Sequence, residues 1–460
     1  MRLFDWRWFV VGSALAVTMA AKAETRPQYG GTLHVAMRAA PASLDPADNS
    51  QPDSLARRSL TMLIFDTLVT TDDNGRVLAS LAASWQVSPG NRWQFRLRRG
   101  VRFHDGTPLT AEIAADSLRA ANPAWNVATD GDTVVIERGG AGPELLAELA
   151  RARNAIAKRN ADATPGGTGP FHIVDWQPGK KLTVAAEEGY WRGRPFLDEI
   201  EIEMGRSFRD QTIALELGKA DLVEVAPEQV HRISLEARRP SSSLPIELLA
   251  LVFSRDANSA DDKMLREALA LSVERGSIRS VLLQGTGQPA ASILPNWMSG
   301  YGFVFPSDAD LARARHAREQ VREIPRWTVA YDGSDPVARL LAERIALNAR
   351  DAGLSLQPTA PSATATAADL RLVRIPLASG DPWIALADIA ALSGAPPAKP
   401  KNSSVEELYA AEQSMLATQR VIPLFHLPVS YAASSNLKNW TTRSDGTWSL
   451  ADSWLGSGKP

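Results

Sequence analysis

Apolar and polar residues alternate with a period of two in several stretches of the first half of the chain. Trp93, Phe95 and Leu97 are each followed by a polar residue, which is the pattern of a strand with one buried face and one solvated face. Residues 32–37 show the same alternation. Further strands are predicted from residue 171 to about residue 249.

Helical periodicity begins in the second half of the chain. Leu265, Leu269 and Val273 are four residues apart and follow Asp261 and Asp262. This spacing places the three apolar side chains on one face of a helix, which the two acidic residues are expected to precede.

A further helix is predicted from the signals at its ends. Asp335 can cap a helix that has Pro336 in its first turn, and Gly353 ends it before Leu354-Ser355-Leu356. Residues 326–330, ahead of this helix, are predicted to form a strand. The alternation of strand and helix favours an α/β lobe in this part of the chain.

Several segments are predicted to interrupt or connect these elements. Residues 164–170 are rich in Gly, Pro and Thr and predict a break in the chain. Residues 361–368 and 391–404 have low complexity and are predicted to be loops. Residues 405–416 are predicted to be a helix, and residues 421–425 a strand that returns toward the first lobe.

The start of the chain has the features of a secretory signal peptide. Arg2 and Arg7 precede the apolar stretch Trp8–Ala20, and small residues at 21–23 suit a cleavage site. We therefore predict cleavage after Ala23 and a periplasmic location. The alternative is an uncleaved anchor, although the stretch is shorter than the roughly 20 residues that a span needs.

Length and composition limit the classes of function. The 460 residues suit two or three domains, and the formal net charge of −2 gives no electrostatic reason to expect nucleic acid or an anionic membrane as a partner. The chain has no cysteine, which excludes both disulfides and a lipid-modified N-terminal cysteine.

The candidate catalytic and metal-binding residues are few. None of the six histidines lies four positions from another, so no helix presents a histidine pair to a metal. His104 and Asp105 could be drawn as a catalytic dyad, but neighbouring side chains point apart, and the turn interpretation is favoured. We predict no catalytic residue, no metal site and no cofactor.

Short motifs follow one another in a characteristic order over most of the chain. They are Gly30-Gly31-Thr32-Leu33, Ser43-Leu44-Asp45-Pro46, Phe65-Asp66-Thr67-Leu68-Val69, Leu81-Ala82-Ala83-Ser84-Trp85, Val101-Arg102-Phe103-His104-Asp105-Gly106, Gly167-Thr168-Gly169-Pro170-Phe171, Tyr190-Trp191-Arg192-Gly193-Arg194-Pro195, Leu265-Arg266-Glu267-Ala268-Leu269 and Ile422-Pro423-Leu424-Phe425. In this order they resemble the extracellular solute-binding proteins of ABC importers, family 5, which includes dipeptide-, oligopeptide- and nickel-binding members.

The resemblance implies a mixed α/β protein with two lobes and an extra domain inserted in lobe I. Mapped onto this sequence, lobe I comprises residues 24–62, 168–250 and 426–460, the extra domain residues 63–167, and lobe II residues 251–425.

The resemblance also implies a function without catalysis. The protein is expected to be a monomer that captures a peptide-like or other small polar ligand by closing its lobes, and then delivers the ligand to an ABC permease in the inner membrane. The alternative is a non-transport descendant that acts as a periplasmic ligand sensor or interaction protein.

One part of the expected ligand site departs from the peptide-binding members that the chain resembles. Those proteins carry an Asp three residues before a pair that corresponds to Asp381-Pro382, and this Asp pairs with the peptide ammonium. The equivalent position here is Ala378. Arg374, on a predicted strand, could instead bind a carboxylate or phosphate, or could be a surface residue at a strand edge.

The resemblance also adds candidate ligand-binding residues. Ser43, Trp383 and His426 join Arg374 and Asp381 as the expected ligand contacts. The short connection between Leu118 and Trp125 is expected to leave the cavity more open or able to hold a larger ligand.

Overall fold

The computed structural model describes residues 26–51, 53–137, 144–159, 165–235, 240–302, 304–360, 368–395 and 403–456. The predicted signal peptide, residues 1–23, lies outside these ranges. Among the helices in the described ranges, none combines the length and the apolar character that crossing a membrane requires.

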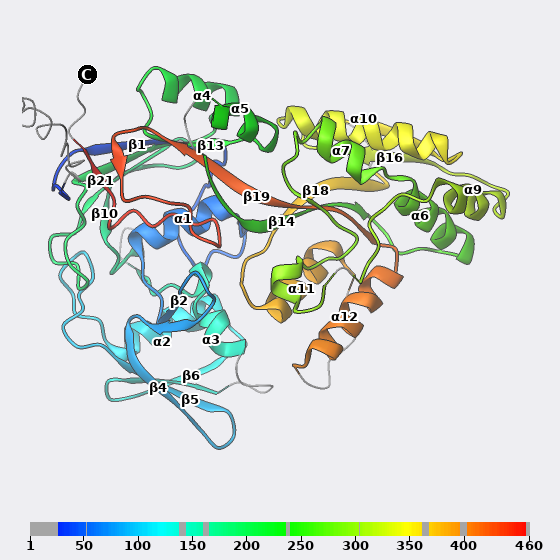
Figure 1. The fold of residues 1–460 in the computed structure, drawn as a ribbon. Helices are drawn as coiled ribbons and strands as arrows, with labels where there is room; N and C mark the ends of the chain where they lie inside the picture. Colours follow the sequence, from blue (N-terminus) through cyan, green and yellow to red (C-terminus); the bar gives the residue numbers. More distant parts are fainter. Residues whose placement is uncertain are drawn as a thin grey trace, which may run out of the picture.

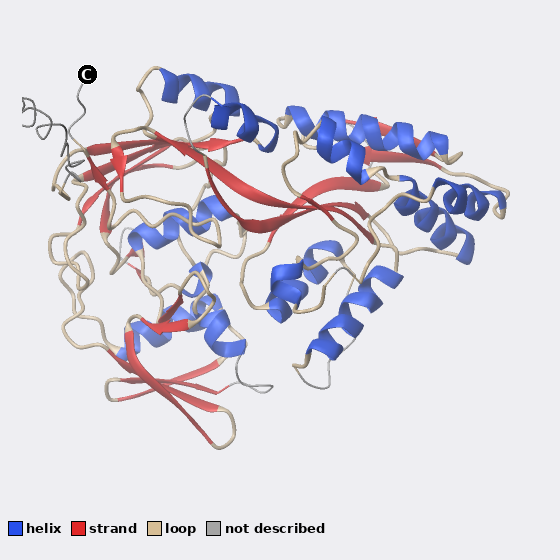
Figure 2. Ribbon diagram, in the orientation of Figure 1, coloured by secondary structure: helices blue, strands red, loops and turns tan. Residues whose placement is uncertain are grey.

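One large mixed sheet runs through both lobes of the molecule (Figures 1 and 2). Its strands follow the order β10-β11-β12-β1-β13-β19-β14-β18-β16-β17, and β15 pairs with β19 outside this path. The strands are β1 (Thr32–Ala36), β10 (Phe171–Gln177), β11 (Lys181–Ala186), β12 (Glu199–Glu203), β13 (Leu222–Val225), β14 (Ser241–Phe253), β15 (Gln288–Pro289), β16 (Arg326–Ala330), β17 (Ser355–Thr359), β18 (Leu370–Pro376) and β19 (Val421–Ala433).

Two long strands carry the chain between the lobes. β14 and β19 have 13 residues each and pair with one another in the middle of the sheet. At roughly 3.3 Å per residue, each can extend about 40 Å. Pro245 lies opposite Pro428, and the register shifts on both sides of Pro245. Because proline donates no hydrogen bond to a ladder, the pairing is interrupted where the lobes meet.

The first lobe packs around the strands at one end of this sheet. Leu33, Val35 and Met37 enter one buried cluster, as their alternation predicts, and helix α1 (Leu55–Ile64) covers it. Helices α4 (Phe208–Glu216) and α5 (Val230–Leu235) pack on the opposite face. The short strands β20 (Leu437–Lys438) and β21 (Trp454–Leu455) pair near the end of the chain.

The extra domain is a separate four-stranded sheet of order β4-β5-β7-β6 with its own core. Thr110 caps the helix α2 (Ala111–Ala121). Phe95 and Leu97 are buried and Trp93 is partly buried, as their alternation predicts. The elements are β2 (Val69–Thr71), β3 (Val77–Ala79), β4 (Ala82–Ser88), β5 (Arg92–Leu97), α2 (Ala111–Ala121), β6 (Asn126–Asp130), β7 (Thr133–Glu137), α3 (Glu144–Leu149), a 3₁₀ turn (Ala152–Asn154), β8 (Lys158–Arg159) and β9 (Pro165–Gly166).

The second lobe alternates strand and helix, as predicted. β16 is parallel to β17 and β18, and α10 (Pro336–Asp351) begins at the predicted cap Asp335. The other helices are α6 (Ala260–Ser272), α7 (Arg275–Val281), α8 (Asn296–Ser299), α9 (Leu311–Glu319), α11 (Pro382–Ser393) and α12 (Val405–Ala417).

Two predicted element boundaries are wrong. Helix α6 begins at Ala260 behind the cap Ser259, so Asp261 and Asp262 lie inside its first turn and do not precede it. Helix α11 continues to Ser393 and ends at Gly394, which adopts a φ of 67°. Residues 391–393 are therefore helical, whereas residues 361–367 of the predicted loop at 361–368 and residues 396–402 of the one at 391–404 lie outside the described residues.

Three of the sequence motifs are explained by contacts where the extra domain joins the first lobe. A Cβ at Gly167 would lie 1.8 Å from the carbonyl oxygen of Ile64, so the backbones approach too closely for any side chain at this position. Asp66 accepts hydrogen bonds from the Trp191 indole (2.9 Å) and the Tyr190 hydroxyl (3.2 Å). The motifs around residues 66, 167 and 190 therefore form one junction.

Candidate functional site

The candidate site is a cavity of about 710 Å³ that is lined by both lobes and the extra domain. The first lobe contributes α1, the start of β14 and the loop at residues 443–448. The extra domain contributes the β2–β3 turn and the end of α3, and the second lobe contributes α8 and residues 377–382. A volume of this size suits a small organic ligand, since ligand pockets span about 300–1,000 Å³.

Large apolar side chains form much of the wall. Met62, Leu146 and Met298 come from different parts of the molecule and border the same space. Leu244 is 39% exposed and Trp297 is 41% exposed, although both line the cavity. The Trp297 indole donates a hydrogen bond to the Pro245 carbonyl (2.9 Å). This bond fixes the orientation of the ring.

Residues 377–382 form a segment of the wall that we call the lip. Asp381, near the end of the lip, caps α11, because one carboxylate oxygen accepts hydrogen bonds from the backbone N–H of Trp383 (2.9 Å) and of Ile384 (3.1 Å). The Asp381 N–H donates to the Ser379 hydroxyl (3.1 Å). The lip is therefore a short structured turn that ends in a helix cap.

Arg58 connects α1 in the first lobe to the lip. Its guanidinium donates to the Leu377 carbonyl (2.9 Å) and to the Asp53 carboxylate (2.8 Å). The side chain is 7% exposed. A cation with fixed partners therefore stands directly beside the lip.

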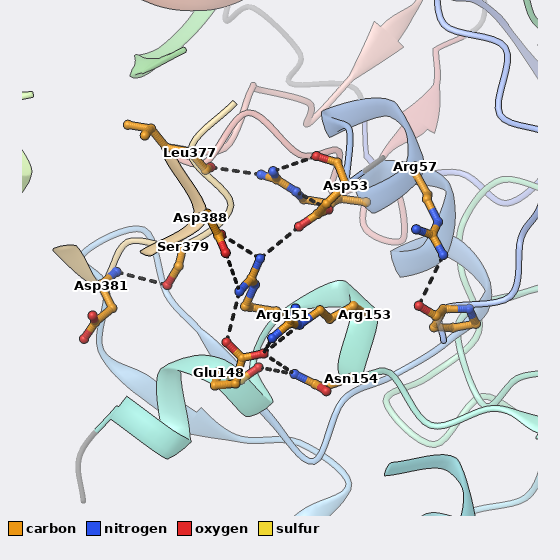
Figure 3. Close-up of polar contacts among 12 residues, drawn as sticks. Asp53, Arg57, Glu148, Arg151, Arg153, Asn154, Leu377, Ser379, Asp381 and Asp388 are labelled. Atoms are coloured by element: carbon orange, nitrogen blue, oxygen red, sulfur yellow. Dashed lines mark hydrogen bonds and ion pairs between the residues drawn. The ribbon is translucent and has the colours of Figure 1, made fainter. Parts of the chain in front are cut away.

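Arg151 in the extra domain reaches both lobes at once (Figure 3). One terminal nitrogen lies 2.8 Å from the Asp388 carboxylate on α11 and 3.1 Å from Asp53 in the first lobe, while the other lies 3.0 Å from Glu148. We call Arg151 with Asp53 and Asp388 the clasp. Because each partner belongs to a different part of the fold, the clasp ties the extra domain to both lobes.

The clasp carboxylates respond differently to their surroundings. Burial raises the pKa of Asp388 above its usual value, against the opposing effect of Arg151. Burial also acts to raise the pKa of Asp53, but the charges of Arg58 and Arg151 outweigh it and lower this pKa. Asp53 therefore stays ionised to a lower pH than Asp388 does.

The opposite side of the cavity is closed by the loop at residues 443–448. Arg443 donates to the Thr71 carbonyl (2.8 Å), which ties this loop to the β2–β3 hairpin of the extra domain. Ser444 donates to Asp73 through its N–H (3.3 Å) and its hydroxyl (3.4 Å). These bonds hold the extra domain against the first lobe.

Among the described residues, Asp381 is the one predicted ligand contact that borders this cavity. Trp383 is the second residue of α11 and packs against a hydrophobic cluster of the second lobe. The Ser43 hydroxyl accepts from the Asp45 N–H (3.2 Å) within its own turn. The His426 ring is 3% exposed and lies 3.1 Å from the Ile293 carbonyl through Nε2.

Arg374 lies in an interior strand, which differs from the alternative of a surface position at a strand edge. β18 has β14 on one side and β16 on the other, and the Arg374 side chain is 18% exposed. It lies 3.1 Å from Asp335 and 3.8 Å from Glu247, beside a smaller cavity of about 360 Å³. The structure therefore brings Arg374 to acidic partners.

Two arginines of the cavity were not predicted from the sequence. Arg58 and Arg151 border the cavity, yet neither belongs to a recognisable motif. A usable signal existed at Arg57 and Arg58, because these two charged residues lie in a helix whose other positions are apolar, Ser or Thr. Both are buried, and Arg57 donates to the carbonyls of Asp45 and Asp48 (2.7 Å each).

Comparisons with known proteins show which family the sequence is similar to. The family model described as "Bacterial extracellular solute-binding proteins, family 5 Middle" matches residues 76–374. The nickel-binding protein NikA of Staphylococcus aureus is 28% identical over 49% of this chain and 49% of its own length. The oligopeptide-binding protein AppA of Bacillus subtilis is 23% identical over 68% of this chain and 62% of its own length. The matched regions thus span about half to two thirds of these curated relatives.

Solved structures extend the likeness of fold to almost the whole chain. Staphylococcus aureus NikA in complex with Ni(L-His)2 has a TM-score of 0.78 at 18% identity, covering 92% of this chain and 100% of that one. A dipeptide-binding protein from Pseudoalteromonas sp. SM9913 in complex with Met-Leu has a TM-score of 0.78 at 17% identity, covering 93% and 100%. At these identities the structures establish the fold.

Proposed function

Because the chain belongs to the bacterial extracellular solute-binding proteins of family 5, we propose that it is the periplasmic substrate-binding component of an ABC importer. It captures a peptide-like or other small polar solute and delivers it to a permease in the inner membrane. The observation that carries the proposal is the cavity of about 710 Å³ that both lobes and the extra domain enclose.

The mechanism is a shift between open and closed forms. A ligand in the cavity contacts both lobes only when they are closed, so it stabilises the closed form by its differential affinity. The crossing strands β14 and β19 supply the hinge. The clasp adds ion pairs between the extra domain and both lobes. The protein acts as a monomer after export and cleavage behind Ala23.

Native mass spectrometry of the protein purified from the periplasm tests this function. We expect a mass excess from a co-purified small molecule, and an N-terminus at Glu24. Removing that molecule by partial unfolding and dialysis should increase the radius of gyration in X-ray scattering, and adding it back should reverse the increase. A protein that carries no small molecule, keeps one radius and instead retains a protein partner would contradict the importer role and favour the sensor or interaction protein.

A further inference from the structure

Residues 290–301 run from the hinge to the wall of the interlobe cavity, and we call this segment the arm. It begins where the Ala290 N–H donates to the Leu424 carbonyl of β19 (2.9 Å), and it contains helix α8. Its buried apolar residues share a hydrophobic cluster with α11 and α12. Trp297, in contrast, is 41% exposed and lines the cavity. The arm is therefore anchored in the second lobe and presents Trp297 to the cavity.

The Trp297 side chain makes two kinds of contact. Its ring borders the cavity, and its indole N–H donates to the Pro245 carbonyl (2.9 Å) in the hinge strand β14. The residue opposite Pro245 on β19 is Pro428, which has no N–H to donate. The arm thus supplies a donor to β14 where the pairing with β19 is interrupted. Because an indole has a single N–H, the ring offers only its apolar surface to the cavity.

Glu412 on α12 holds the arm on both sides of Trp297. One carboxylate oxygen accepts hydrogen bonds from the N–H groups of Ile293 and Leu294 (3.0 Å from Leu294), and the other accepts from the Tyr301 hydroxyl. The side chain is fully buried. Burial raises the pKa of this carboxyl group, against the opposing effect of the three hydrogen bonds.

These hydrogen bonds provide what the apolar cluster lacks. Hydrophobic attraction has no direction, so packing alone does not set the position of the Trp297 indole to within hydrogen-bond distance of Pro245. Hydrogen bonds are directional, and those of Glu412 fix the backbone before and after α8. A carboxylate also accepts more strongly than a neutral group does. The placement of Trp297 therefore depends on Glu412.

From these contacts we propose that Trp297 connects the second lobe to the hinge strand β14 at Pro245, and that Glu412 is the positioning residue that holds Trp297 for this contact. The inference rests on the proposed capture function, because it concerns the hinge of the lobe movement. It adds a second role to a residue of the cavity wall.

The first test follows the indole N–H of Trp297 by heteronuclear NMR in protein freed of small molecules by partial unfolding and dialysis. The Trp297 signal is the one that is lost in Trp297→Phe. In Glu412→Ala this N–H should exchange with solvent about tenfold faster or more, because its bond to Pro245 is lost. Glu412→Gln keeps an acceptor for both backbone N–H groups and should hold the change to about threefold. Glu406→Ala, an exposed position on the same helix, is the matched control.

Trp383 distinguishes a positioning role from general support of the core, because its ring packs against the same hydrophobic cluster. Its indole signal, identified by its loss in Trp383→Phe, should not change in Glu412→Ala. If both indole signals change together, or if Glu412→Gln behaves like Glu412→Ala, the positioning role is overturned. Should Glu412→Ala fail to fold, Tyr301→Phe removes one of the three donors and should change the Trp297 signal in the same direction by a smaller amount.

Hydrogen exchange in β14 tests the contact at the hinge. Trp297→Phe keeps an aromatic ring but loses the N–H, so the amides of Ile246 and Glu247 beside Pro245 should exchange about threefold faster or more. Trp383→Phe is the control, and equal exchange in the two variants overturns the role at the hinge. Neither test needs a ligand, so their failure leaves the capture function standing. A protein isolated without a small molecule contradicts capture and leaves the hinge contact unaffected.

Discussion

Single buried arginine side chains hold irregular segments of the backbone in place by donating hydrogen bonds to their carbonyl oxygens. Arg57 donates to the carbonyls of Asp45, Pro46 and Asp48, and Arg275 donates twice to the Pro423 carbonyl in β19. A guanidinium has five N–H donors in a fixed plane, so a single side chain can satisfy several backbone oxygens that no strand or helix uses. Burial lowers the pKa of Arg275 to about 10, which leaves it charged at neutral pH.

The buried ring of His426 should make the protein sensitive to acid. Burial lowers its pKa to about 4, from an ordinary value of 6.5. The unfolded chain therefore binds the proton first, and the free energy of unfolding falls as the pH drops from 6.5 toward 4, by up to about 3 kcal/mol. His426→Gln should remove this part of the slope in urea unfolding measured between pH 7 and pH 4. The surface variant His316→Gln is the control, and an unchanged slope in His426→Gln would contradict the assignment.

The same residue shows what a sequence can predict about a single position. His426 directly follows the motif Ile422-Pro423-Leu424-Phe425 and lies on the crossing strand β19, but a polar residue at a crossing can face either the cavity or the core. The choice depends on the register of β19 against β14 and β15, and these strands pair His426 with Leu248 and Gln288, far away in the chain. Arg374 differs in the same way, since its acidic partners come from β14 and the cap of α10.

At the scale of elements, the end of a helix can be predicted from the sequence where the residue that determines it is close by in the chain. Thr110 and Asp335 start helices because their side-chain oxygens accept from N–H groups two or three residues ahead. The end of α11 was missed because Ala391–Ser393 carries no stop signal, and Gly394 beyond it supplies the stop. Capping residues are therefore more reliable than low complexity as boundary markers.

The cap of α11 should couple helix stability to the shape of the lip. Asp381→Ala removes the acceptor for two N–H groups and should cost about 1 kcal/mol in the free energy of unfolding. It should also weaken ligand binding, because the lip turn leads directly into the cap. Asp381→Ser keeps a capping oxygen and should retain most of both. Full loss of binding in Asp381→Ser with unchanged stability would instead point to direct contact between the carboxylate and the ligand.

At the scale of the whole molecule, closure of the lobes depends on contacts between residues that are far apart in the sequence, so no local sequence pattern predicts it. Arg151 and Asp388 are 237 positions apart, yet they meet in the clasp. The clasp joins the extra domain to both lobes, so the extra domain takes part in closing the cavity. Removing one partner of a buried ion pair is costly, because the charge that remains is still shielded from water but no longer has an opposite charge beside it.

Replacing Arg151 should therefore open the ligand-free protein. In Arg151→Ala the Asp53 and Asp388 carboxylates lose their shared partner and gain hydration when the lobes separate, so the radius of gyration in X-ray scattering should rise. Binding of a ligand should weaken by about tenfold or more, since closure then costs at least an additional 1.4 kcal/mol. Arg153→Ala is the matched control, because Arg153 pairs with Glu148 inside the extra domain. An identical radius in both variants, with folding intact by circular dichroism, would show that the clasp does not hold the lobes together.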